Sequence, residues 1–589
     1  MAKWFVTAKR ADFTKIGETF GISPVLARII RNRDIIEEEE IRKYLQGTIE
    51  DMYDPGLLKD MDRTVEILLD KISRRKPIRI IGDYDADGIC STFILHKGLL
   101  QAGAAADTAI PHRMKDGYGL NEHLVEDAFQ SGIDTIITCD NGIAAEPQIR
   151  LAKEKGMTVI VTDHHEVPYE ETDGERKYIL PPADAVIDPK QEGDAYPYKG
   201  ICGAVVAYKV MEALYRKLEL TQKERPLLEE LLEMAAFATV CDVMELLDEN
   251  RVIVKFGLSH MKNTSNQGLR ALMEVNGIDK GKLSAYHIGF VMGPCLNATG
   301  RLDTAVRALQ LLEEEDRAEA VRIASDLKQL NDSRKEMTDI YVKQAVRSVE
   351  ENGLMQDRVL VIYLPDCHES LAGIIAGRIR EKYYKPVFVL TRGEEGVKGS
   401  GRSIEAYHMY EEMTRVRHLF TKYGGHKMAA GLSLEEKDVE VFRREINEVC
   451  TLTESDMEER IHIDVPMPVS HVSMEFVKEL ELLEPFGKGN VKPVFVEKNL
   501  EILSARILGK NKNVLKMQVQ DAPGTQMDAM YFGDVEAFLE FFREKYGKPA
   551  VDGLLRGQRS KVEAAFTYYP GINEYMGQKT VQIIIQNYQ

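Results

Sequence analysis

Acidic residues and histidines follow four short apolar segments in the first third of the chain. They are Asp83, Asp85 and Asp87 after 78–81, Asp140 after 135–138, Asp163, His164, His165 and Glu166 after 158–161, and Asp188 after 185–187. Carboxylates that share a site raise one another's pKa and destabilise the site unless cations neutralise them. Oxygen ligands alone suit Mg²⁺ or Ca²⁺, and added imidazole moves the expectation toward Mn²⁺, Fe, Co or Zn. These residue types therefore predict a site for divalent metal.

The segments that must position these residues alternate between apolar and amphipathic ones. The apolar segments are Ile78–Ile81, Thr108–Ile110, Thr135–Thr138, Thr158–Val161 and Ala185–Ile187. Amphipathic segments such as Thr92–Leu100 and Ala145–Lys155 lie between them. This alternation predicts a doubly wound α/β domain, in which helices cover both faces of a parallel sheet. Because ligands of such sheets bind at the carboxyl ends of the strands, we expect the acids to converge on one edge.

A calcium-binding loop and a set of helix caps would also use aspartates, but both fit the sequence less well. Asp83, Asp85 and Asp87 begin like a calcium-binding EF-hand loop, but position twelve, where that loop needs glutamate, is Ile94. Helix N-caps favour aspartate, yet capping would account for one or two of these residues and not for the adjacent histidines. For Asp188, which precedes Pro189, a role in a turn fits as well as a role as ligand.

The rest of the chain predicts several further domains, since 589 residues correspond to about three to five domains. A long amphipathic stretch from Arg317 to Asn352 predicts a connecting helix, and a second α/β pattern begins at Val359–Leu364. After residue 460, short alternating segments separated by turn residues predict an all-β barrel or sandwich. The predicted divisions are 1–75 (helical), 76–215 (catalytic α/β), 216–352 (helical, ending in the long helix), 353–458 (smaller α/β) and 459–589 (β-barrel).

Composition narrows the class of protein. With 77 Lys and Arg against 95 Asp and Glu, the net charge is −18, which argues against a wholly cationic nucleic-acid binder. Residues 371–430, however, carry eleven Lys and Arg and six acids, and this local excess predicts a phosphate-contacting surface, with a solvated basic face as the alternative. The seven cysteines form no C-x-x-C pair, which favours free thiols in a reducing compartment. We find neither a signal peptide nor an apolar run long enough to span a membrane, and therefore expect a cytoplasmic protein.

Several sequence motifs of the chain resemble those of a known family. Gly82-Asp-Tyr-Asp-Ala-Asp-Gly88 together with Asp163-His-His165 resembles the DHH phosphoesterase superfamily. Further motifs are similar to those of the RecJ single-strand-specific DNA exonucleases: 111–119 (PHRMKDGYG), 293–301 (GPCLNATGR), 424–426 (GGH) and 483–490 (LEPFGKGN). The resemblance extends from about residue 45 to the end of the chain.

The resemblance implies roles for individual residues. The metal ligands would be Asp85, Asp87, Asp140, His164 and Asp242; Asp83 and His165 would be catalytic or lie directly behind the ligands; and Arg113, Tyr118, Asn297, Arg301, Ser400, Arg402 and His426 would bind nucleic acid. Asp140 would bridge two Mn²⁺ or Mg²⁺ ions, and the arginines with Ser400 would hold the 5′-terminal phosphate. Asp242 enters on resemblance alone, because its spacing would not have placed it in the site. The protonation state of His165 stays open.

The smaller α/β region matches the family's DHH-associated domain, and the C-terminal region resembles an OB-type barrel, a fold often used for single strands. In this barrel the segment Arg506–Lys516, with Lys510 and Lys512, is a candidate DNA-facing surface. Tyr531, Phe532, Tyr568 and Tyr569 are candidate stacking residues, although we expect core packing for most of them.

The function implied is metal-dependent 5′→3′ hydrolysis of single-stranded DNA to mononucleotides, in DNA repair and recombination. The resemblance also suggests a single-strand-binding protein and a helicase as partners. One alternative is a phosphodiesterase acting on short oligoribonucleotides or cyclic dinucleotides, against which the C-terminal barrel argues. The other is a non-catalytic scaffold, against which the complete ligand set argues.

Overall fold

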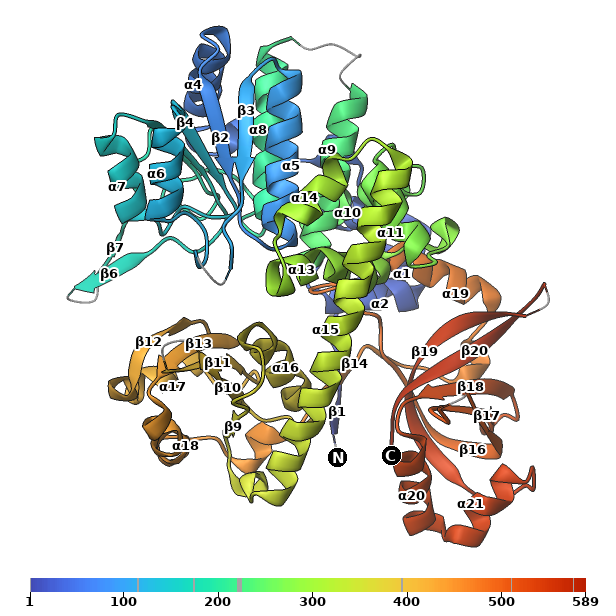
Figure 1. Cartoon of the computed structure of the whole chain (residues 1–589). Helices are drawn as coiled ribbons and strands as arrows, with labels where there is room; N and C mark the ends of the chain where they lie inside the picture. Colours follow the sequence, from blue (N-terminus) through green and yellow to red (C-terminus); the bar gives the residue numbers. More distant parts are fainter. Residues whose placement is uncertain are drawn as a thin grey trace. The chain divides into compact units, whose positions relative to one another are not determined.

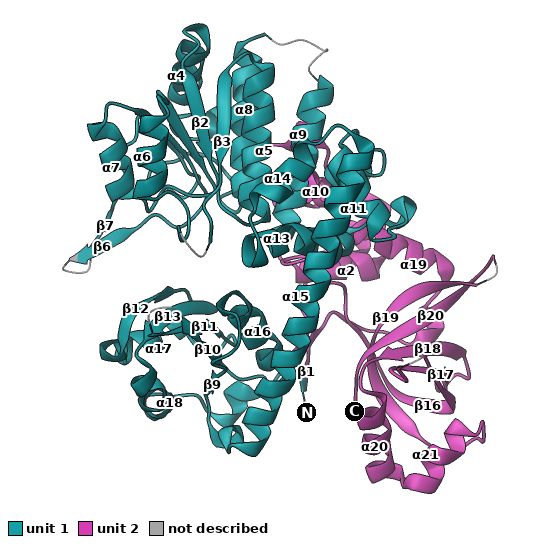
Figure 2. Cartoon of the chain, viewed as in Figure 1, with its two compact units in different colours: residues 1–3, 54–242, 257–459 teal, residues 4–53, 243–256, 460–589 magenta. Residues whose placement is uncertain are grey.

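A computed structural model describes residues 2–113, 116–172, 175–219, 225–393, 396–509, 511–575 and 577–589. The chain divides into two compact units, each built from separate stretches of sequence (Figure 2). Unit 1 comprises 1–3, 54–242 and 257–459, and unit 2 comprises 4–53, 243–256 and 460–589. None of the helices in the described ranges combines the length and the apolar character needed to cross a membrane.

The first sheet of unit 1 is a five-stranded parallel sheet, as the sequence predicts (Figure 1). Its order is β3 (Ala105–Ala109), β2 (Pro77–Ile81), β4 (Thr135–Cys139), β5 (Thr158–Thr162) and β8 (Ala185–Ile187). One face packs on α6 (Glu122–Gln130) and α7 (Glu146–Glu154). On the other face lie α4 (Met61–Ser73), α5 (Ala86–Gln101) and α8 (Gly203–Lys217). Because all five strands are parallel, their carboxyl ends share one edge, and the acids that follow them meet there.

A group of helices follows this sheet and leads to the predicted long helix. It consists of α9 (Arg225–Cys241), α11 (Gln267–Val275), α13 (Gly293–Leu302), α14 (Val306–Glu313) and α15 (Arg317–Glu351). Helix α15 begins at an N-cap, where the Asp316 carboxylate accepts a hydrogen bond from the Glu319 amide. It packs on α11 and α13 near its start and on α16 (Ala372–Tyr383) near its end. The connecting helix predicted from the sequence is therefore confirmed.

The second sheet of unit 1 is mixed. Its order is β12 (Phe420–Gly425), β13 (Ala429–Leu434), β11 (Gly396–Arg402), β10 (Val387–Gly393) and β9 (Leu360–Tyr363). Only β9 and β10 pair in parallel. One face buries an apolar cluster against α17 (Met409–Arg415) and α18 (Val439–Glu448). On the other face, α16 covers β9 and β10, because Val387 and Val389 pack against Ile375 and Ile379.

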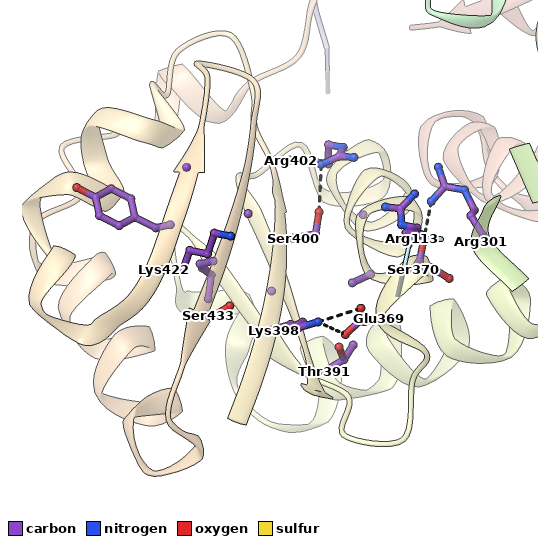
Figure 3. A pocket seen from close by; sticks show the side chains of 17 residues that line it. Arg113, Arg301, Glu369, Ser370, Thr391, Lys398, Ser400, Arg402, Lys422 and Ser433 are labelled. Atoms are coloured by element: carbon purple, nitrogen blue, oxygen red, sulfur yellow. Dashed lines mark hydrogen bonds and ion pairs between the residues drawn. The ribbon is translucent and has the colours of Figure 1, made fainter. Parts of the chain in front are cut away.

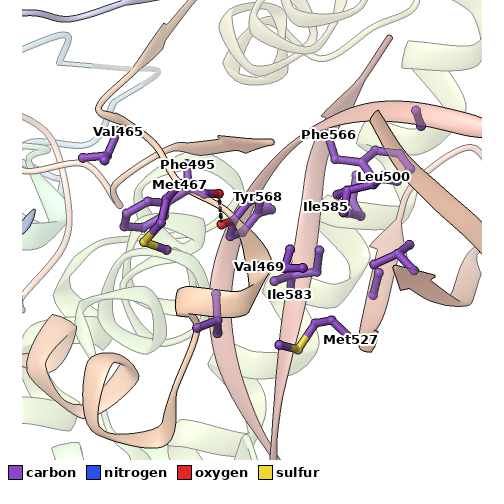
Figure 4. Packing of buried hydrophobic residues seen from close by; sticks show 14 of the residues in the cluster. Val465, Met467, Val469, Phe495, Leu500, Met527, Phe566, Tyr568, Ile583 and Ile585 are labelled. Atoms are coloured by element: carbon purple, nitrogen blue, oxygen red, sulfur yellow. Dashed lines mark hydrogen bonds between the residues drawn. The ribbon is translucent and has the colours of Figure 1, made fainter. Parts of the chain in front are cut away.

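Unit 2 contains the predicted barrel. Six strands run in the order β15 (Val465–Pro466), β16 (Phe495–Leu508), β17 (Val514–Gln520), β18 (Gln526–Phe532), β20 (Gln578–Tyr588) and β19 (Glu563–Tyr575), and β16 also pairs with β19. This last pairing closes the sheet on itself. Figure 4 shows the barrel interior, where the buried Tyr568 hydroxyl donates to the Met467 carbonyl at 2.7 Å. Helices α1 (Phe13–Phe20), α2 (Pro24–Asn32) and α3 (Glu38–Gln46) pack on the same core.

The expectation of a purely β region after residue 460 needs correction. Three helices belong to it, α19 (Met474–Leu480), α20 (Val535–Tyr546) and α21 (Lys548–Leu555). In α20 the buried residues Val535, Phe538, Leu539 and Phe542 recur at spacings of three and four, which is helical periodicity. The strand-like segments on either side of the pair α20 and α21 hide these short helical patterns in the sequence.

The aromatic residues considered for base stacking occupy different environments. Tyr568 is fully buried and stacks on Phe495, which confirms the expectation of core packing at that position. Tyr531 and Tyr569 are half-buried against Phe538 and Phe486, respectively. Phe532 is 56% exposed. Lys510 lies outside the described residues, and Lys512 is exposed.

Candidate metal centre and phosphate pocket

Three aspartates of the loop after β2 lie at the carboxyl edge of the parallel sheet. Asp85 caps helix α5, and its Oδ1 accepts hydrogen bonds from the Asp87 and Gly88 amides at 2.9 and 3.1 Å. Asp83 is buried, and its Oδ2 has no hydrogen-bond partner among the described residues. Burial, and then the charge of Asp85, raise the pKa of Asp83 to about 8. One of the three aspartates is thus a helix cap, and the loop still holds further buried carboxylates.

The Asp87 carboxylate is fixed by the start of another helix. Its Oδ2 accepts from the Gly203 amide at 2.7 Å and its Oδ1 from the Ala204 amide at 2.8 Å. These amides belong to the first turn of α8, where backbone N–H groups have no partner within the helix. A Cβ at Gly203 would lie 2.8 Å from the Asp140 Cβ, so glycine allows α8 to approach the end of β4.

Asp140 lies at the centre of the cluster. It is buried after β4 and has a positive φ of 59°, a conformation that aspartate tolerates better than most residues. Its Oδ1 is 3.1 Å from the His164 Nε2. Burial raises the pKa of Asp140 well above its ordinary value, and the charges of Asp87 and Asp85 raise it further. A buried carboxyl among other carboxyls favours a bound cation.

His164 connects three carboxylates from three elements. Its Nε2 lies 3.1 Å from Asp140, 3.5 Å from Asp87 and 3.8 Å from Asp242, measured to the nearest carboxylate oxygen. Its Nδ1 is buried and has no hydrogen-bond partner in the described ranges. Burial lowers the pKa of His164, which favours the neutral imidazole that metals bind. Asp242 directly follows α9, and the structure brings it to the site that the resemblance implied.

His165 is held by the preceding aspartate. Asp163 is buried, and its Oδ1 lies 2.7 Å from the His165 Nδ1, while its Oδ2 accepts from the Ile143 amide at 2.9 Å. Burial has the largest single effect and lowers the pKa of His165, but the hydrogen bond and charge of Asp163, together with the charges of Asp242 and Asp87, raise it to about 9. The Tyr118 hydroxyl donates to the Asp140 carbonyl at 2.9 Å and lies 3.2 Å from the His165 Nε2. The ring of His165 is therefore fixed on both sides.

The donor atoms fit a site for more than one divalent ion. Three groups have ligand atoms within 4.8 Å of one another: Asp83, Asp85 and Asp140; Asp140, His164 and His165; and Asp87, His164 and Asp242. Asp140 and His164 each belong to two groups, which joins the three into one cluster. The orphaned Asp83 Oδ2 and His164 Nδ1 and the mixed oxygen and nitrogen donors fit Mn²⁺ or Mg²⁺.

Asp188 does not join these groups. It is buried, and its Oδ1 accepts from the Lys190 amide at 2.8 Å. Burial, and then the charge of Asp163, raise the pKa of Asp188 to about 7. Of the two roles left open by the sequence, this hydrogen bond favours the turn.

A pocket of about 460 Å³ gathers most of the predicted phosphate-binding residues (Figure 3). Arg113 and Arg301 come from the catalytic part of unit 1, and Ser400 and Arg402 come from β11. Arg402 Nη1 donates to the Ser400 Oγ at 3.3 Å and to the Gly401 carbonyl at 2.7 Å. A Cβ at Gly373, in the first turn of α16, would lie 2.8 Å from Arg402 Nη2, so the glycine leaves room for this side chain. The helix N-terminus and the arginines together suit an anion.

Among the described residues, no carboxylate forms an ion pair with the arginines of this pocket. Arg301 Nη1 donates to the Ser370 carbonyl at 2.8 Å, and Arg113 lies over the Tyr84 ring at 4.8 Å. Burial, and then the charge of Arg113, lower the pKa of Arg301 to about 10. Burial also lowers the pKa of Arg402. Buried cations of this kind are stabilised when a phosphate enters.

Helix α13 connects the two sites. Asn297 Oδ1 accepts from the Ala86 amide at 2.8 Å, beside the Asp85 cap, and Arg301, one helical turn further on, lines the phosphate pocket. Tyr118, predicted to bind nucleic acid, contacts Asp140 and His165. His426 is exposed after β12 and is not among the residues that line the pocket.

Several residues of these sites do not stand out in the sequence. Gly203 and Ala204 hold Asp87, and Gly373, Lys398 and Lys422 border the phosphate pocket. Gly203 and Ala204 act through their backbone amides, which almost every residue type has, so the sequence gives no signal for their role. The two lysines lie in the basic stretch 371–430, and the excess of charge there is the available signal.

Comparison with known proteins agrees with this architecture. Residues 77–239 match the family model described as DHH family, N-terminal domain, residues 356–452 match the DHHA1 domain, and residues 463–587 match the RecJ OB domain. The single-stranded-DNA-specific exonuclease RecJ of Bacillus subtilis is 34% identical over 99% of this chain and 70% of its own length. That of Haemophilus influenzae is 31% identical over 97% of both chains.

A solved structure, that of RecJ from Thermus thermophilus in complex with Mn²⁺, superposes with a TM-score of 0.81. It is 26% identical, and the match covers 100% of this chain and 79% of that one. Sequence identity over nearly the whole length and the three matched domains lead to one conclusion: the chain belongs to the RecJ family.

Proposed function

We propose that the protein is a metal-dependent 5′→3′ exonuclease that hydrolyses single-stranded DNA to mononucleotides in DNA repair and recombination. The observation that carries this proposal is the pairing of a carboxylate and histidine cluster with an arginine pocket through one helix. Asn297 and Arg301 of α13 contact the two sites and fix their spacing. A fixed spacing between a terminal-phosphate site and a metal centre favours cleavage at a set distance from a strand end.

The residues that would hold two Mn²⁺ or Mg²⁺ ions are Asp85, Asp87, Asp140, His164 and Asp242, and Asp140 belongs to two of the donor groups. When bound, such ions supply an activated water and stabilise the charge that develops on the phosphodiester oxygens. The protein's own contribution is to orient the ligands. The α8 amides hold Asp87, and the fully buried Asp163 holds His165 so that its Nε2 points toward Tyr118.

The proposed substrate contacts begin at the 5′ end. Arg113, Arg301, Ser400 and Arg402 would take the terminal phosphate, and the barrel of unit 2 would bind the strand further along. Arginine suits this role because its planar guanidinium binds phosphate through two hydrogen bonds. His165, adjacent to the metal ligands, would contact the scissile phosphate or the leaving oxygen.

Partners and location form the remaining part of the proposal. A single-strand-binding protein and a helicase would supply and present the single strand. All seven cysteines are free, and six of them are buried, which is consistent with a reducing cytoplasm.

The test uses a 3′-labelled single strand bearing a 5′ phosphate, with Mn²⁺, Mg²⁺ or EDTA, beside the matching duplex and the matching RNA. The proposal predicts shortening from the 5′ end of the single strand, arrested by EDTA. Degradation of short RNA or cyclic dinucleotides alone would make the protein an oligonucleotide phosphodiesterase. Binding without cleavage in any metal would make it a scaffold.

A further inference from the structure

The phosphate pocket extends beyond the residues that a single terminal phosphate requires. Its volume of about 460 Å³ includes space bordered by Thr391, Lys398, Lys422 and Ser433, none of which contacts the arginines in the interactions of the described residues. These four residues come from β10, β11, β12 and β13, on the side of the pocket away from Arg113 and Arg301 (Figure 3).

Strand register places these four residues in one row. Lys398 is paired with Thr391 on one side and with Ser433 on the other, and Ser433 is paired with Lys422. A second row, Ser400, Gly431 and Gly424, runs parallel to it across the same strands. The two rows are two residues apart, so their side chains share one face and lie about 7 Å apart along the strands.

The two glycines of the second row leave the sheet face between Ser400 and the first row free of side chains; we call this stretch the glycine floor. A Cβ at Gly424 would meet no atom within 4 Å, and a Cβ at Gly431 would meet only the Gly399 carbonyl at 3.9 Å. A group bound at Ser400 and Arg402 can therefore extend along the sheet face toward the first row without meeting a side chain.

The first row, which consists of Lys422, Ser433, Lys398 and Thr391, contains hydrogen-bond donors without partners among the described residues. Thr391 is fully buried, and its Oγ1 has no hydrogen-bond partner among the described residues although the residue lines the pocket. Lys422 is exposed and forms no ion pair within the described part of the chain. Lys398 Nζ lies 2.9 Å from Glu369 Oε2, so this pair is close to neutral and the charge of Lys422 remains. A buried hydroxyl without a partner is costly, which makes the row a built site for a polar group.

We propose that this row is a second phosphate subsite, which binds the outer phosphates of a 5′-diphosphate or 5′-triphosphate end. The inference rests on the proposed function, because it takes the first phosphate to lie at Ser400 and Arg402. From there two phosphoanhydride links reach along the glycine floor to Lys422 and the Ser433 hydroxyl, whereas Thr391 lies at the other end of the row, beyond Lys398. Glu369 repels an anion at its own position, so the outer phosphate lies on the Lys422 side of Lys398. The protein would thus accept strands that still carry the triphosphate of a newly initiated chain.

The experiment measures binding of three 3′-fluorescent single-stranded DNA oligomers that differ only at the 5′ end, which is a hydroxyl, a monophosphate or a triphosphate. Anisotropy is recorded in EDTA, so that no strand is cut. The variant is Lys422→Gln, and the control is Lys437→Gln. Lys437 is exposed on the same domain, is paired with Glu435 and lies outside the pocket. Thermal unfolding checks that every variant is folded.

The proposal predicts that the wild-type protein binds the triphosphate end at least as tightly as the monophosphate end. Lys422→Gln should weaken triphosphate binding by about tenfold, the effect of one charge-assisted hydrogen bond, and weaken monophosphate binding clearly less. Lys437→Gln should change neither. If the wild type binds the triphosphate oligomer ten times more weakly than the monophosphate oligomer, the second subsite is refuted. It is also refuted if Lys422→Gln lowers the affinity for both oligomers equally. Equal binding of the hydroxyl and monophosphate ends would instead refute the first phosphate site, and the subsite with it.

Discussion

The Asp163 carboxylate and the His165 imidazole form a hydrogen bond of 2.7 Å at the edge of the parallel sheet. Asp163 is 1% exposed and also accepts hydrogen bonds from the Ile143 and His164 amides, so it cannot reorient. The pair therefore fixes a histidine whose other nitrogen faces the proposed reaction site. Such carboxylate–histidine pairs beside metal centres set the orientation and basicity of the ring.

Replacing Asp163 by asparagine tests this positioning role. The amide places an N–H₂ group where the carboxylate accepts hydrogen bonds, so His165 loses its fixed orientation. We expect the cleavage rate of a 5′-phosphorylated single strand to fall by roughly 10–100-fold, with little change in strand binding. The control is Asp184→Asn, which removes the ion pair of a half-exposed carboxylate with Lys153 in the same domain. An Asp163→Asn enzyme with wild-type rate would contradict the role assigned to the pair.

Removal of metal should lower the stability of the protein. Without cations the buried carboxylates around Asp140 lie close to one another, and ligand binding stabilises the folded state by mass action. At a Mn²⁺ concentration a hundred times the dissociation constant, the gain is about 2.7 kcal/mol. Calorimetry of EDTA-treated protein should show unfolding at a higher temperature after Mn²⁺ is added. The same addition to an Asp85→Ala, Asp140→Ala double variant should have no effect, and an equal shift in both would place the ion elsewhere.

The terminal-phosphate pocket predicts a preference for phosphorylated ends. Replacing Arg402 by glutamine removes a buried cation that pairs with no carboxylate in the described part of the chain, and a charge-assisted hydrogen bond is worth roughly 1.5–3 kcal/mol. The KM for a 5′-phosphorylated strand should therefore rise by about 10–100-fold, while the KM for a 5′-hydroxyl strand stays nearly constant. Arg392→Gln on the neighbouring strand, whose arginine pairs with Glu436 at the surface, is the matched control. If Arg402→Gln raises the KM of the 5′-phosphorylated and the 5′-hydroxyl strand equally, Arg402 does not recognise the phosphate.

The ion pair of His96 with Glu313 predicts a dependence of stability on pH. The hydrogen bond that His96 donates to the Glu313 carboxylate raises the pKa of His96 above its ordinary value of about 6.5. A raised folded-state pKa gives stability that is fully present below the unfolded pKa and is lost as pH rises through the folded pKa. The melting temperature of the wild type relative to Glu313→Gln should accordingly fall as pH increases from 6 to 8. A difference that grows over this range would reverse the sign and contradict the pairing.

The strands and the acids at their ends could be predicted from the sequence because a parallel sheet is buried on both faces. Its strands are continuous apolar segments, and Asp140 or Asp163 directly follows such a segment. Asp242 follows a helix, and only the packing of α9 brings it to within 3.8 Å of His164. Motif resemblance identified it where periodicity could not.

Tertiary packing also determines the position of His426 and of the helices in the C-terminal region, which the sequence does not predict. His426 follows two glycines in a motif expected at the site, but it lies exposed after β12, outside the pocket lining. Helices α20 and α21 of the C-terminal region escape prediction because the pair lies between the strand-forming segments of β18 and β19. Phe538 and Phe542 of α20 fill the barrel core and share it with residues of the N-terminal helices, a long-range contact that no local pattern specifies.

The cluster around Asp140 is the proposed catalytic metal centre. Asp134 and Asp140 flank the same strand, β4, at its two ends, which provides a matched pair of variants. Asp134 pairs with Lys71 at the far end of the strand from the cluster. The measurement is the rate of 5′→3′ cleavage of a phosphorylated single strand in Mn²⁺, with circular dichroism and strand binding measured on the same preparations. We predict that Asp140→Ala abolishes cleavage while it keeps the fold and most of the strand binding, and that Asp134→Ala remains active. Cleavage by a well-folded Asp140→Ala protein would contradict the claim.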